Sequence, residues 1–366
     1  MLAIEARSLR QSDIAGVAQL FQQRFRDPSK PASAPLLAYL EDVFLNHPWR
    51  DSEQMSKVVV DGDGRVQGFV GVFPQRYVHK DSVIRTSVLG TLMSSDPNRN
   101  PLVGAKLLRS ALGGSQDLSL SESANPLSLK MWEKSGGATL PLFSLSWLRV
   151  LRPAAMSLAM LCERYPFFAP ASPVANGLDR LAKRFGSEFL SIVADGAQGK
   201  DFEVGPDEFA AAVPALSKRY EIRPQWDGTI LSWLLQHANS KSAYGPVMMR
   251  LVKDKRDRVV GGYIYYGRRH GIAFVLQLLA EPGAERLVVD NLLAHAEASS
   301  FAAVRGRLQP EFLDALVRQK SMLFRRSATV IHTRSASLQT AFAGPNALIS
   351  GLAAEGWTRL IGEEFS

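Results

Sequence analysis

The segment VVVDGDGRVQGFVGV, residues 58–72, has the pattern of a β-hairpin, because β-branched strand residues flank an Asp-Gly-Asp-Gly turn. A second segment, LVKDKRDRVVGGYIYY at residues 251–266, has the same pattern. The two segments align so that Arg65-Val66-Gln67-Gly68 corresponds to Arg258-Val259-Val260-Gly261. We therefore predict two hairpins of one design in a chain built from two related halves.

The elements predicted around each hairpin follow one order: helices, the hairpin, a strand, a helix, a strand, a helix and a closing strand. Strands that alternate with helices at this spacing indicate a mixed α/β sheet in each half. We expect one domain at residues 1–151, closed by a strand within residues 139–151, and a second domain at residues 200–366. Residues 152–199 are expected to form a helical linker, since prolines interrupt its apolar segments: Pro153, Pro166, Pro170 and Pro173.

The composition is that of a soluble globular protein. The 366 residues are 46% hydrophobic and 21% charged, and they suffice for two domains of roughly 150 residues. The single cysteine, Cys162, excludes a disulfide or a thiolate metal cluster within one chain, which fits a cytoplasmic location. The N-terminus carries charges where a signal peptide needs an apolar core. Glu163 and Arg164 interrupt the apolar segment at residues 153–171, so we expect no membrane-spanning helix.

The net charge of +8 is compatible with nucleic acid, with an anionic ligand or with solubility alone. The sequence contains no run of five basic residues, and its aromatic residues do not alternate regularly with Arg and Lys. These features disfavour nucleic-acid binding. A phosphate-bearing coenzyme or an anionic substrate would account for the sign of the charge equally well.

Motifs that would assign another chemistry are missing from the sequence. There is no Gly-x-Ser-x-Gly of a hydrolase and no His-Glu-x-x-His of a zinc enzyme. The six histidines show no pair at metal-ligand spacing, so no metal site is expected. The glycine-rich turn at residues 62–68 opens no helix, which argues against a dinucleotide site.

The segment SVLGTLMSSDPNRNPLVGAKLL, residues 87–108, has the pattern of a strand, a turn and a helix start. The first turn of a helix has unpaired N–H groups and a partial positive charge, which together can hold a pyrophosphate. Gly104 and Ala105 are small enough for close approach, and Arg99 adds a cation. An ordinary joint between a strand and a helix is the alternative interpretation.

With its surroundings, this segment resembles the GCN5-related N-acetyltransferase (GNAT) family. The residues Pro97, Arg99, Gly104 and Ala105 fit the coenzyme loop of that family loosely. The family also has an asparagine after the next strand and a helix ending in Tyr-Glu-Lys-x-Gly. Here Asn125 and the Trp132-Glu133-Lys134 stretch occupy those places. The resemblance implies two tandem acyl-CoA N-acyltransferase (GNAT-like) domains.

The resemblance also implies a reaction, in which acetyl-CoA acetylates an amine of a small molecule or a sugar. A backbone N–H, for which we choose Met93, would hold the thioester carbonyl oxygen. Glu122 is our candidate general base, with Ser121 or Ser123 orienting a water molecule, and His79 is a weaker candidate. The coenzyme-binding residues that the resemblance implies are Leu92, Met93, Arg99, Asn100, Val103, Gly104, Ala105, Asn125 and Trp132.

The sequence departs from the family pattern in ways that keep other functions open. Pro101 and Val103 replace loop glycines, and Trp132 replaces a tyrosine that can protonate the leaving thiolate. The second half lacks the coenzyme loop and has Glu285 and Asp290 near the helix start, so we expect it to shape the acceptor pocket instead. A catalytically degenerate module that binds a ligand or partner, or a FemABX-like aminoacyl transferase, remains an alternative. The acceptor and the oligomeric state stay open.

Overall fold

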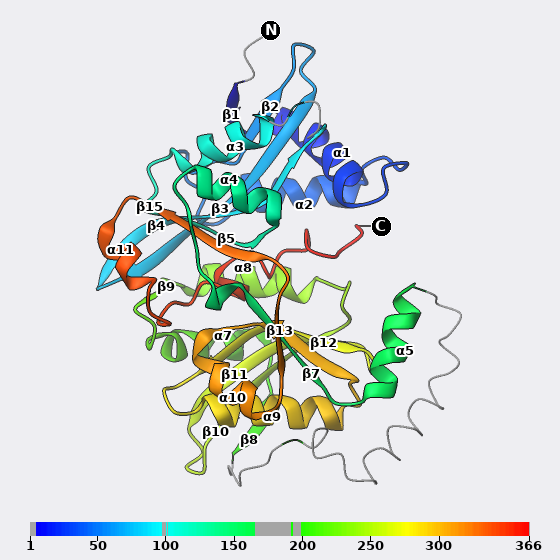
Figure 1. Cartoon of the computed structure of the whole chain (residues 1–366), viewed down its shortest axis with the longest axis vertical. Helices are drawn as coiled ribbons and strands as arrows, with labels where there is room; N and C mark the ends of the chain where they lie inside the picture. Colours follow the sequence, from blue (N-terminus) through cyan, green and yellow to red (C-terminus); the bar gives the residue numbers. More distant parts are fainter. Residues whose placement is uncertain (1–4, 97–99, 101, 165–191, 193–198, 366) are drawn as a thin grey trace.

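Two mixed β-sheets lie one above the other along the long axis of the computed structural model, which describes residues 5–96, 100, 102–164, 192 and 199–365 (Figure 1). The first sheet contains, in spatial order, β1 (Ala6–Ser8), β2 (Lys57–Val60), β3 (Val66–His79), β4 (Ser82–Ser94), β5 (Leu118–Ala124), β15 (Ala328–Thr333) and β6 (Ala138–Thr139), with β9 (Ile222–Pro224) beside β3. The second sheet contains β14 (Met322–Arg325), β7 (Leu145–Val150), β13 (Ala303–Arg307), β12 (Ile272–Ala280), β11 (Val259–Tyr266), β10 (Val247–Lys253) and β8 (Lys200–Glu203). The predicted mixed α/β class is confirmed.

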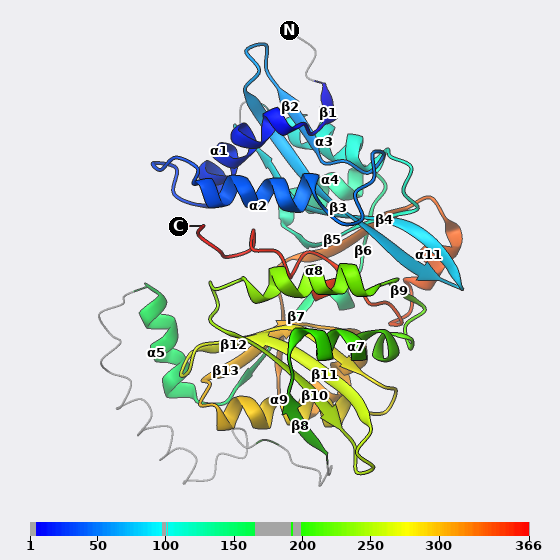
Figure 2. The ribbon, with the colours of Figure 1, turned by 180° about the vertical axis from the view of Figure 1, so that it is seen from behind.

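Helices cover both faces of each sheet (Figures 1 and 2). The first sheet packs between one pair of helices, α1 (Ile14–Phe25) and α2 (Ala34–Leu45), and another pair, α3 (Leu102–Leu112) and α4 (Pro126–Lys134). The second sheet packs between α7 (Pro206–Ser217) and α8 (Gly228–Asn239) on one face and α9 (Glu285–Ala298) and α10 (Leu313–Arg318) on the other. The other helices and 3-10 turns of the described residues are α5 (Pro153–Arg164), α11 (Ala336–Ala341), η1 (Gln11–Asp13), η2 (Leu142–Ser144), η4 (Pro310–Phe312) and η5 (Gly351–Ala353).

The two predicted hairpins are present and have equivalent details. In the first hairpin Gly68 pairs with Val59, and the register of the two strands shifts directly after Val59. In the second hairpin Gly261 pairs with Val252, and the register shifts directly after Val252. A Cβ atom on Gly68 would lie 2.5 Å from Cγ1 of Val103 on α3, and one on Gly261 would overlap Val288 on α9. The glycine therefore recurs because a helix lies directly on the hairpin in each half.

The closing strands of the two halves are exchanged. We expected the strand within residues 139–151 to complete the first half, but β7 pairs with β13 and β14 in the second sheet. In return, β15 from the second half pairs with β5 and β6 in the first sheet. Figure 1 shows the orange β15 among blue and cyan strands and the green β7 in the lower sheet. Side-chain alternation predicts a strand but not its neighbours, so this expectation was wrong.

The C-terminal tail, residues 342–365, runs between the two sheets and joins their cores (Figure 2). Trp357 is fully buried there, and its ring centroid lies 5.5 Å from that of Phe73 and 5.0 Å from that of Trp233. Arg26, which follows the last residue of α1, donates hydrogen bonds to the carbonyls of Leu360 and Glu363. One hydrophobic core thus extends from α1 and α2 through the tail to α7 and α8.

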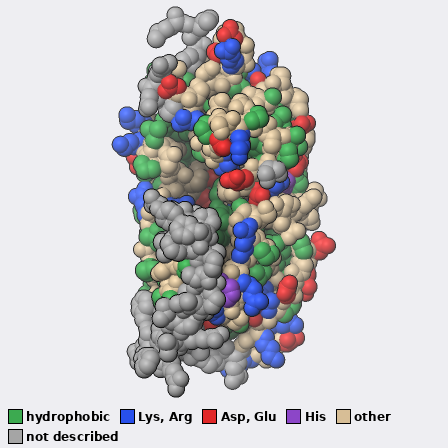
Figure 3. Space-filling view, turned by 90° about the vertical axis from the view of Figure 1, so that its right-hand side faces the viewer, with side chains coloured by type: hydrophobic (Ala, Val, Ile, Leu, Met, Phe, Trp, Pro, Cys, Tyr) green, Lys and Arg blue, Asp and Glu red, His purple; other side chains and the backbone are tan. Residues whose placement is uncertain are grey.

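The described surface mixes the two signs of charge. On the face drawn in Figure 3, basic and acidic side chains are interspersed over both halves. Within the described ranges, no helix combines the length and the apolar composition needed to cross a bilayer.

Candidate active site

The candidate site lies where β4 and β5 separate. The two strands pair in parallel only from Thr86 to Val88 on β4. A register shift in the β3–β4 ladder and a positive φ of 55° at Thr91 mark a β-bulge just beyond this point. A bulge bends its strand and increases the local twist. The ends of β4 and β5 therefore diverge and leave an opening within the sheet.

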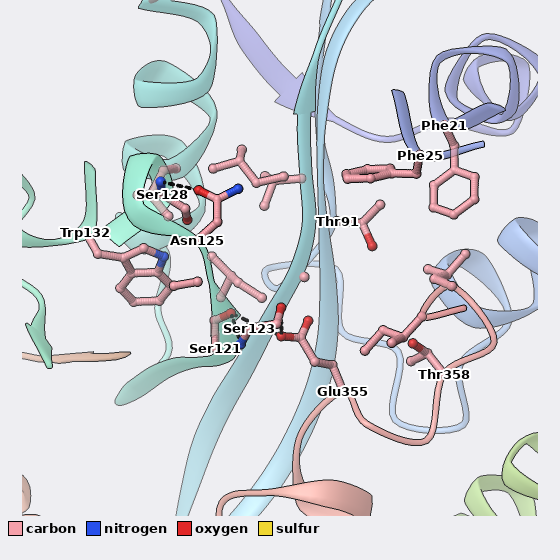
Figure 4. Close-up of a pocket in the computed structure, with 18 residues that line it drawn as sticks. Phe21, Phe25, Thr91, Ser121, Ser123, Asn125, Ser128, Trp132, Glu355 and Thr358 are labelled. Carbon is pink, nitrogen blue, oxygen red and sulfur yellow. Dashed lines mark hydrogen bonds between the residues drawn. The ribbon is translucent and has the colours of Figure 1, made fainter. Parts of the chain in front are cut away.

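The opening forms a cavity of about 220 Å³, which we call the splay pocket (Figure 4). Phe21 and Phe25 of α1 lie on one side of the cavity, and Trp132 of α4 lies on the opposite side. Polar side chains come from the two strands, the start of α4 and the tail, and they include Thr91, Ser121, Ser123, Asn125, Ser128, Glu355 and Thr358. The pocket thus has apolar walls and a polar centre, as small-molecule sites commonly do.

Glu355 of the tail is the acidic group at the centre of the splay pocket. Its side chain is 3% exposed, and its Oε1 atom accepts hydrogen bonds from Ser123 Oγ at 2.5 Å and Ser121 Oγ at 3.2 Å. A Cβ atom on Gly90 of β4 would overlap the carboxylate of Glu355. The absence of a side chain at Gly90 therefore makes room for this carboxylate between the diverging strands.

Burial raises the pKa of Glu355 to about 7, because an ionised carboxylate loses its water there. The nearby charge of Glu122 raises this pKa further, while the hydrogen bond from Ser123 and the charge of Arg307 lower it. A carboxylate with a pKa near 7 can hold or release a proton at neutral pH, which is the property of a general base.

Glu122, our predicted base, lies on the other side of β5 and has a different set of contacts. Its carboxylate accepts the backbone N–H of Gly351 at 3.3 Å and also receives the N–H groups of Glu355 and Gly356. Burial raises its pKa, and Arg307 and these three N–H groups lower it. Through these backbone contacts Glu122 fixes the turn that presents Glu355.

Two further side chains fix the same turn of the tail. Gln277 of β12 accepts the N–H of Leu352 at 3.1 Å through Oε1. The hydroxyl of Tyr77 on β3 donates to the carbonyl of Ala353. Tyr77 and Gln277 are both buried; Tyr77 belongs to the first sheet and Gln277 to the second. The position of Glu355 therefore depends on both halves of the chain.

A second cavity of about 190 Å³ continues from the splay pocket toward the start of α3, and the two share Phe25, Leu92, Asn125 and Ser128. Met93 and Gly104, both implied by the resemblance, line this second cavity. A Cβ atom on Gly104 would lie 3.3 Å from Cε of Met131, so α3 and α4 approach closely here. The structure thus brings several of the predicted coenzyme residues to one groove.

Asn125 begins α4 and faces both cavities. Its Oδ1 atom accepts the N–H of Ser128 at 2.8 Å, which caps the helix. Its amide nitrogen lies on the pocket side in Figure 4. Asn125 can therefore cap the helix and donate a hydrogen bond to a ligand at once.

The other predicted residues have less direct positions. Val103 is buried against the hairpin, Ala105 is half-buried on α3, and Trp132 is buried at the pocket wall. Asn100 is exposed, and its N–H donates to the carbonyl of Asp96 in the turn before α3. Arg99, like Pro97 and Pro101, lies outside the described residues.

His79, the weaker candidate base, lies at the far end of β3. It pairs there with Ser82, and its Nε2 atom is 3.3 Å from a carboxylate oxygen of Glu221. His79 is buried there. It contacts the second half rather than the splay pocket.

Among the described residues, no group of three or more His, Cys, Asp or Glu side chains lies close enough to hold a metal ion.

Glu355 is not among the site residues predicted from the sequence. The available signal is a lone carboxylate in the otherwise apolar segment ALISGLAAEGW, residues 347–357. Charged residues are rarely buried without a specific reason, so this glutamate warranted attention. Its partners Ser121 and Ser123 are more than 200 residues away in the sequence, and no local pattern connects them.

Comparison with known proteins identifies the fold. No protein-family model and no curated protein sequence matches the chain. Three solved structures each match 90% of it. One is a conserved protein of unknown function from Enterococcus faecalis V583, described as a probable N-acyltransferase, with a TM-score of 0.60, 9% identity and 72% of its own length covered.

The other two are GCN5-related N-acetyltransferases. The protein from Anabaena variabilis has a TM-score of 0.58, 12% identity and 72% of its length covered. The protein from Kribbella flavida has a TM-score of 0.53, 12% identity and 71% of its length covered. At these identities the likeness shows the fold, and it confirms the expected GNAT-like architecture.

Proposed function

We propose that this chain, which has the GCN5-related N-acetyltransferase fold, is an acyltransferase that transfers an acetyl group from acetyl-CoA to an amine. The observation that carries the proposal is Glu355, a carboxylate with a pKa raised to about 7 at the centre of the splay pocket. The acceptor would be a small molecule or a sugar with a free amine. Acetyl-CoA is a substrate here, and the residues of the groove fit it as described below.

The diverging strands suit an extended ligand with amide groups. Beyond Val88 and Leu120, β4 and β5 do not pair with each other. Backbone groups left without a strand partner can hydrogen-bond to the amides of an extended chain, as in β-augmentation. The pantetheine arm of acetyl-CoA has two such amides, and the groove past Met93 and Gly104 leads from there to the start of α3.

The proposed reaction forms a C–N bond and breaks a C–S bond. Glu355 takes the proton that the attacking amine must lose, and its pKa near 7 matches that task at neutral pH. The backbone N–H of Met93 stays our prediction for the donor to the thioester oxygen, beside the bulge at Thr91. The thiolate leaves with the bonding electrons and takes a proton from solvent, because an indole such as Trp132 is no acid at this pH.

Glu122 has a positioning role in this scheme. It lies on the opposite side of β5 from the splay pocket and binds the backbone of the turn that carries Glu355. The prediction that Glu122 is the base is therefore replaced, in this proposal, by Glu355 as the base and Glu122 as its support.

The test is calorimetry with acetyl-CoA followed by an assay of free CoA with a panel of amines. We expect micromolar coenzyme binding, and Glu355→Gln should lower kcat by about 10²–10⁴-fold while coenzyme affinity stays within about twofold. Glu364→Gln is the matched control, because it removes an exposed carboxylate from the same tail. Absence of coenzyme binding up to millimolar concentration would rule out the proposal. Full activity of Glu355→Gln would rule out this base.

A further inference from the structure

Another cavity of about 440 Å³ lies against the second sheet and shares Ile361 with the splay pocket; we call it the basic cavity. Trp147 of β7, Phe274 of β12 and Arg305 of β13 form part of its wall. Lys241 and Tyr244, which follow α8, form another part. The basic cavity is larger than the splay pocket and is lined mainly by residues of the second half.

The charge lining this cavity is mostly positive. Its basic side chains are Lys241, Arg305, Arg307 and Arg326. Among the described residues that line it, Glu122 is the acidic one, and its carboxylate is already bound by the N–H groups of the tail. The cavity therefore favours an anion.

Two buried hydrogen-bond donors that line the cavity have fewer acceptors than they could bind. Lys241 is 3% exposed, and its Nζ atom donates to the carbonyl of Gly356 at 3.1 Å, its one hydrogen bond within the described part of the chain. An ammonium group has three N–H bonds. Trp147 is fully buried, and its Nε1 atom has no hydrogen-bond partner among the described residues. Buried polar groups are nearly always paired, so both donors point to a missing acceptor.

The indole N–H of Trp147 lies beside a glycine that lines the same cavity. Gly306 also lines the basic cavity, and a Cβ atom at this position would stand 3.1 Å from Nε1 of Trp147. The glycine leaves no side chain over this nitrogen, which is buried and has no partner among the described residues. A ligand oxygen at this place would satisfy it.

Flat apolar surfaces lie beside these donors. The ring of Tyr244 stacks on that of Phe274 with centroids 4.3 Å apart, and Arg305 lies 4.0 Å over the ring of Phe274. Lys241 Nζ is 5.2 Å from the ring centroid of Tyr244. Tyr244 and Arg305 together cover the two faces of Phe274, so the ring edge of Phe274 is what an aromatic or short aliphatic body next to an anionic group would contact.

We propose that the basic cavity binds an organic anion, namely a carboxylate or phosphate monoester attached to a small aromatic or aliphatic body. The donors are Lys241 and Trp147, and Phe274 contacts the body of the ligand. This site lies in the half opposite the coenzyme groove and needs no coenzyme.

The experiment uses the full chain without coenzyme and measures the binding of benzoate, phenyl phosphate and the uncharged benzyl alcohol by calorimetry. At least one of the two anions should bind at least tenfold more tightly than benzyl alcohol, and the tighter anion identifies the acidic group. Lys241→Met should weaken its binding at least tenfold. Lys255→Met, which removes an exposed lysine from the β10–β11 turn, should leave its binding unchanged.

Trp147→Phe provides a second variant, which keeps an aromatic ring but removes the indole N–H together with part of the ring system. It should weaken anion binding severalfold, and it decides the matter if Lys241→Met does not fold. Far-UV circular dichroism checks the fold of each variant. The proposal is overturned if neither anion binds below about 10 mM, if benzyl alcohol binds equally well, or if folded variants bind the anion like the wild type.

Discussion

Replacing Glu355 with glutamine should change how the stability of the protein depends on pH. Burial raises the pKa of this carboxyl group from 4.5 to about 7 in the folded chain. Below about pH 4.5 the group is protonated in the folded and the unfolded chain alike. Between about pH 4.5 and 7 the folded chain keeps a proton that the unfolded chain has lost. The free energy of unfolding contributed by this group therefore falls as pH rises through that window.

The expected size follows from the pKa. At about 1.4 kcal/mol for each pH unit, a pKa raised from 4.5 to about 7 corresponds to about 3 kcal/mol. Glutamine does not ionise, so the free energy of unfolding of Glu355→Gln does not fall with pH on account of this side chain. The stability of the variant relative to the wild type should thus increase by about 3 kcal/mol between about pH 4.5 and pH 7.5.

The assay is urea unfolding followed by tryptophan fluorescence, at several pH values in this window and at constant salt. Most other titrating groups cancel in the difference between the variant and the wild type. Glu364→Gln, in the exposed part of the tail, should show no such trend. A difference for Glu355→Gln that stays flat within about 0.5 kcal/mol, near the error of the method, would refute the raised pKa.

Three other substitutions test the geometry of the splay pocket. Gly90→Ala places a methyl group on the carboxylate of Glu355, so it should destabilise the fold by about 1–3 kcal/mol and lower acetyl transfer more than tenfold. Gly228→Ala, with no atom within 4 Å of the added Cβ, should do neither. Glu122→Gln removes a charge that raises the pKa of Glu355, so the rising limb of the pH–rate profile should move to lower pH; an unchanged limb would contradict the coupling. Trp132→Phe should keep kcat within about twofold at the cost of about 1–3 kcal/mol of stability, measured by urea unfolding, and a large loss of kcat would show that the indole takes part in the reaction.

The sequence was informative where local chemistry decides the structure. The glycines at 68 and 261 mark places where a helix packs on a hairpin, so the duplication is visible in the sequence. Asn125 followed by Pro126 marks a capped helix start, and the structure has one there. Side-chain preferences of this kind act over a few residues, so they can be recognised without knowledge of the fold.

The sequence was uninformative where distant segments meet. The exchange of β7 and β15 depends on pairing between strands more than 150 residues apart, and alternation along one strand does not specify its partner. The splay pocket depends on the tail, because Glu355 reaches Ser121 and Ser123 only after both sheets have formed. Its raised pKa arises from burial, which no spacing of residues in the sequence expresses.

The exchanged strands have a consequence for the history of the chain. After a duplication, two side-by-side copies could still be inherited or lost one at a time. Once each copy takes its final strand from the other, deleting either gene segment leaves the survivor with an unfilled place beside β5 or β13. Selection must then maintain both halves together, because neither sheet can be completed without the other half.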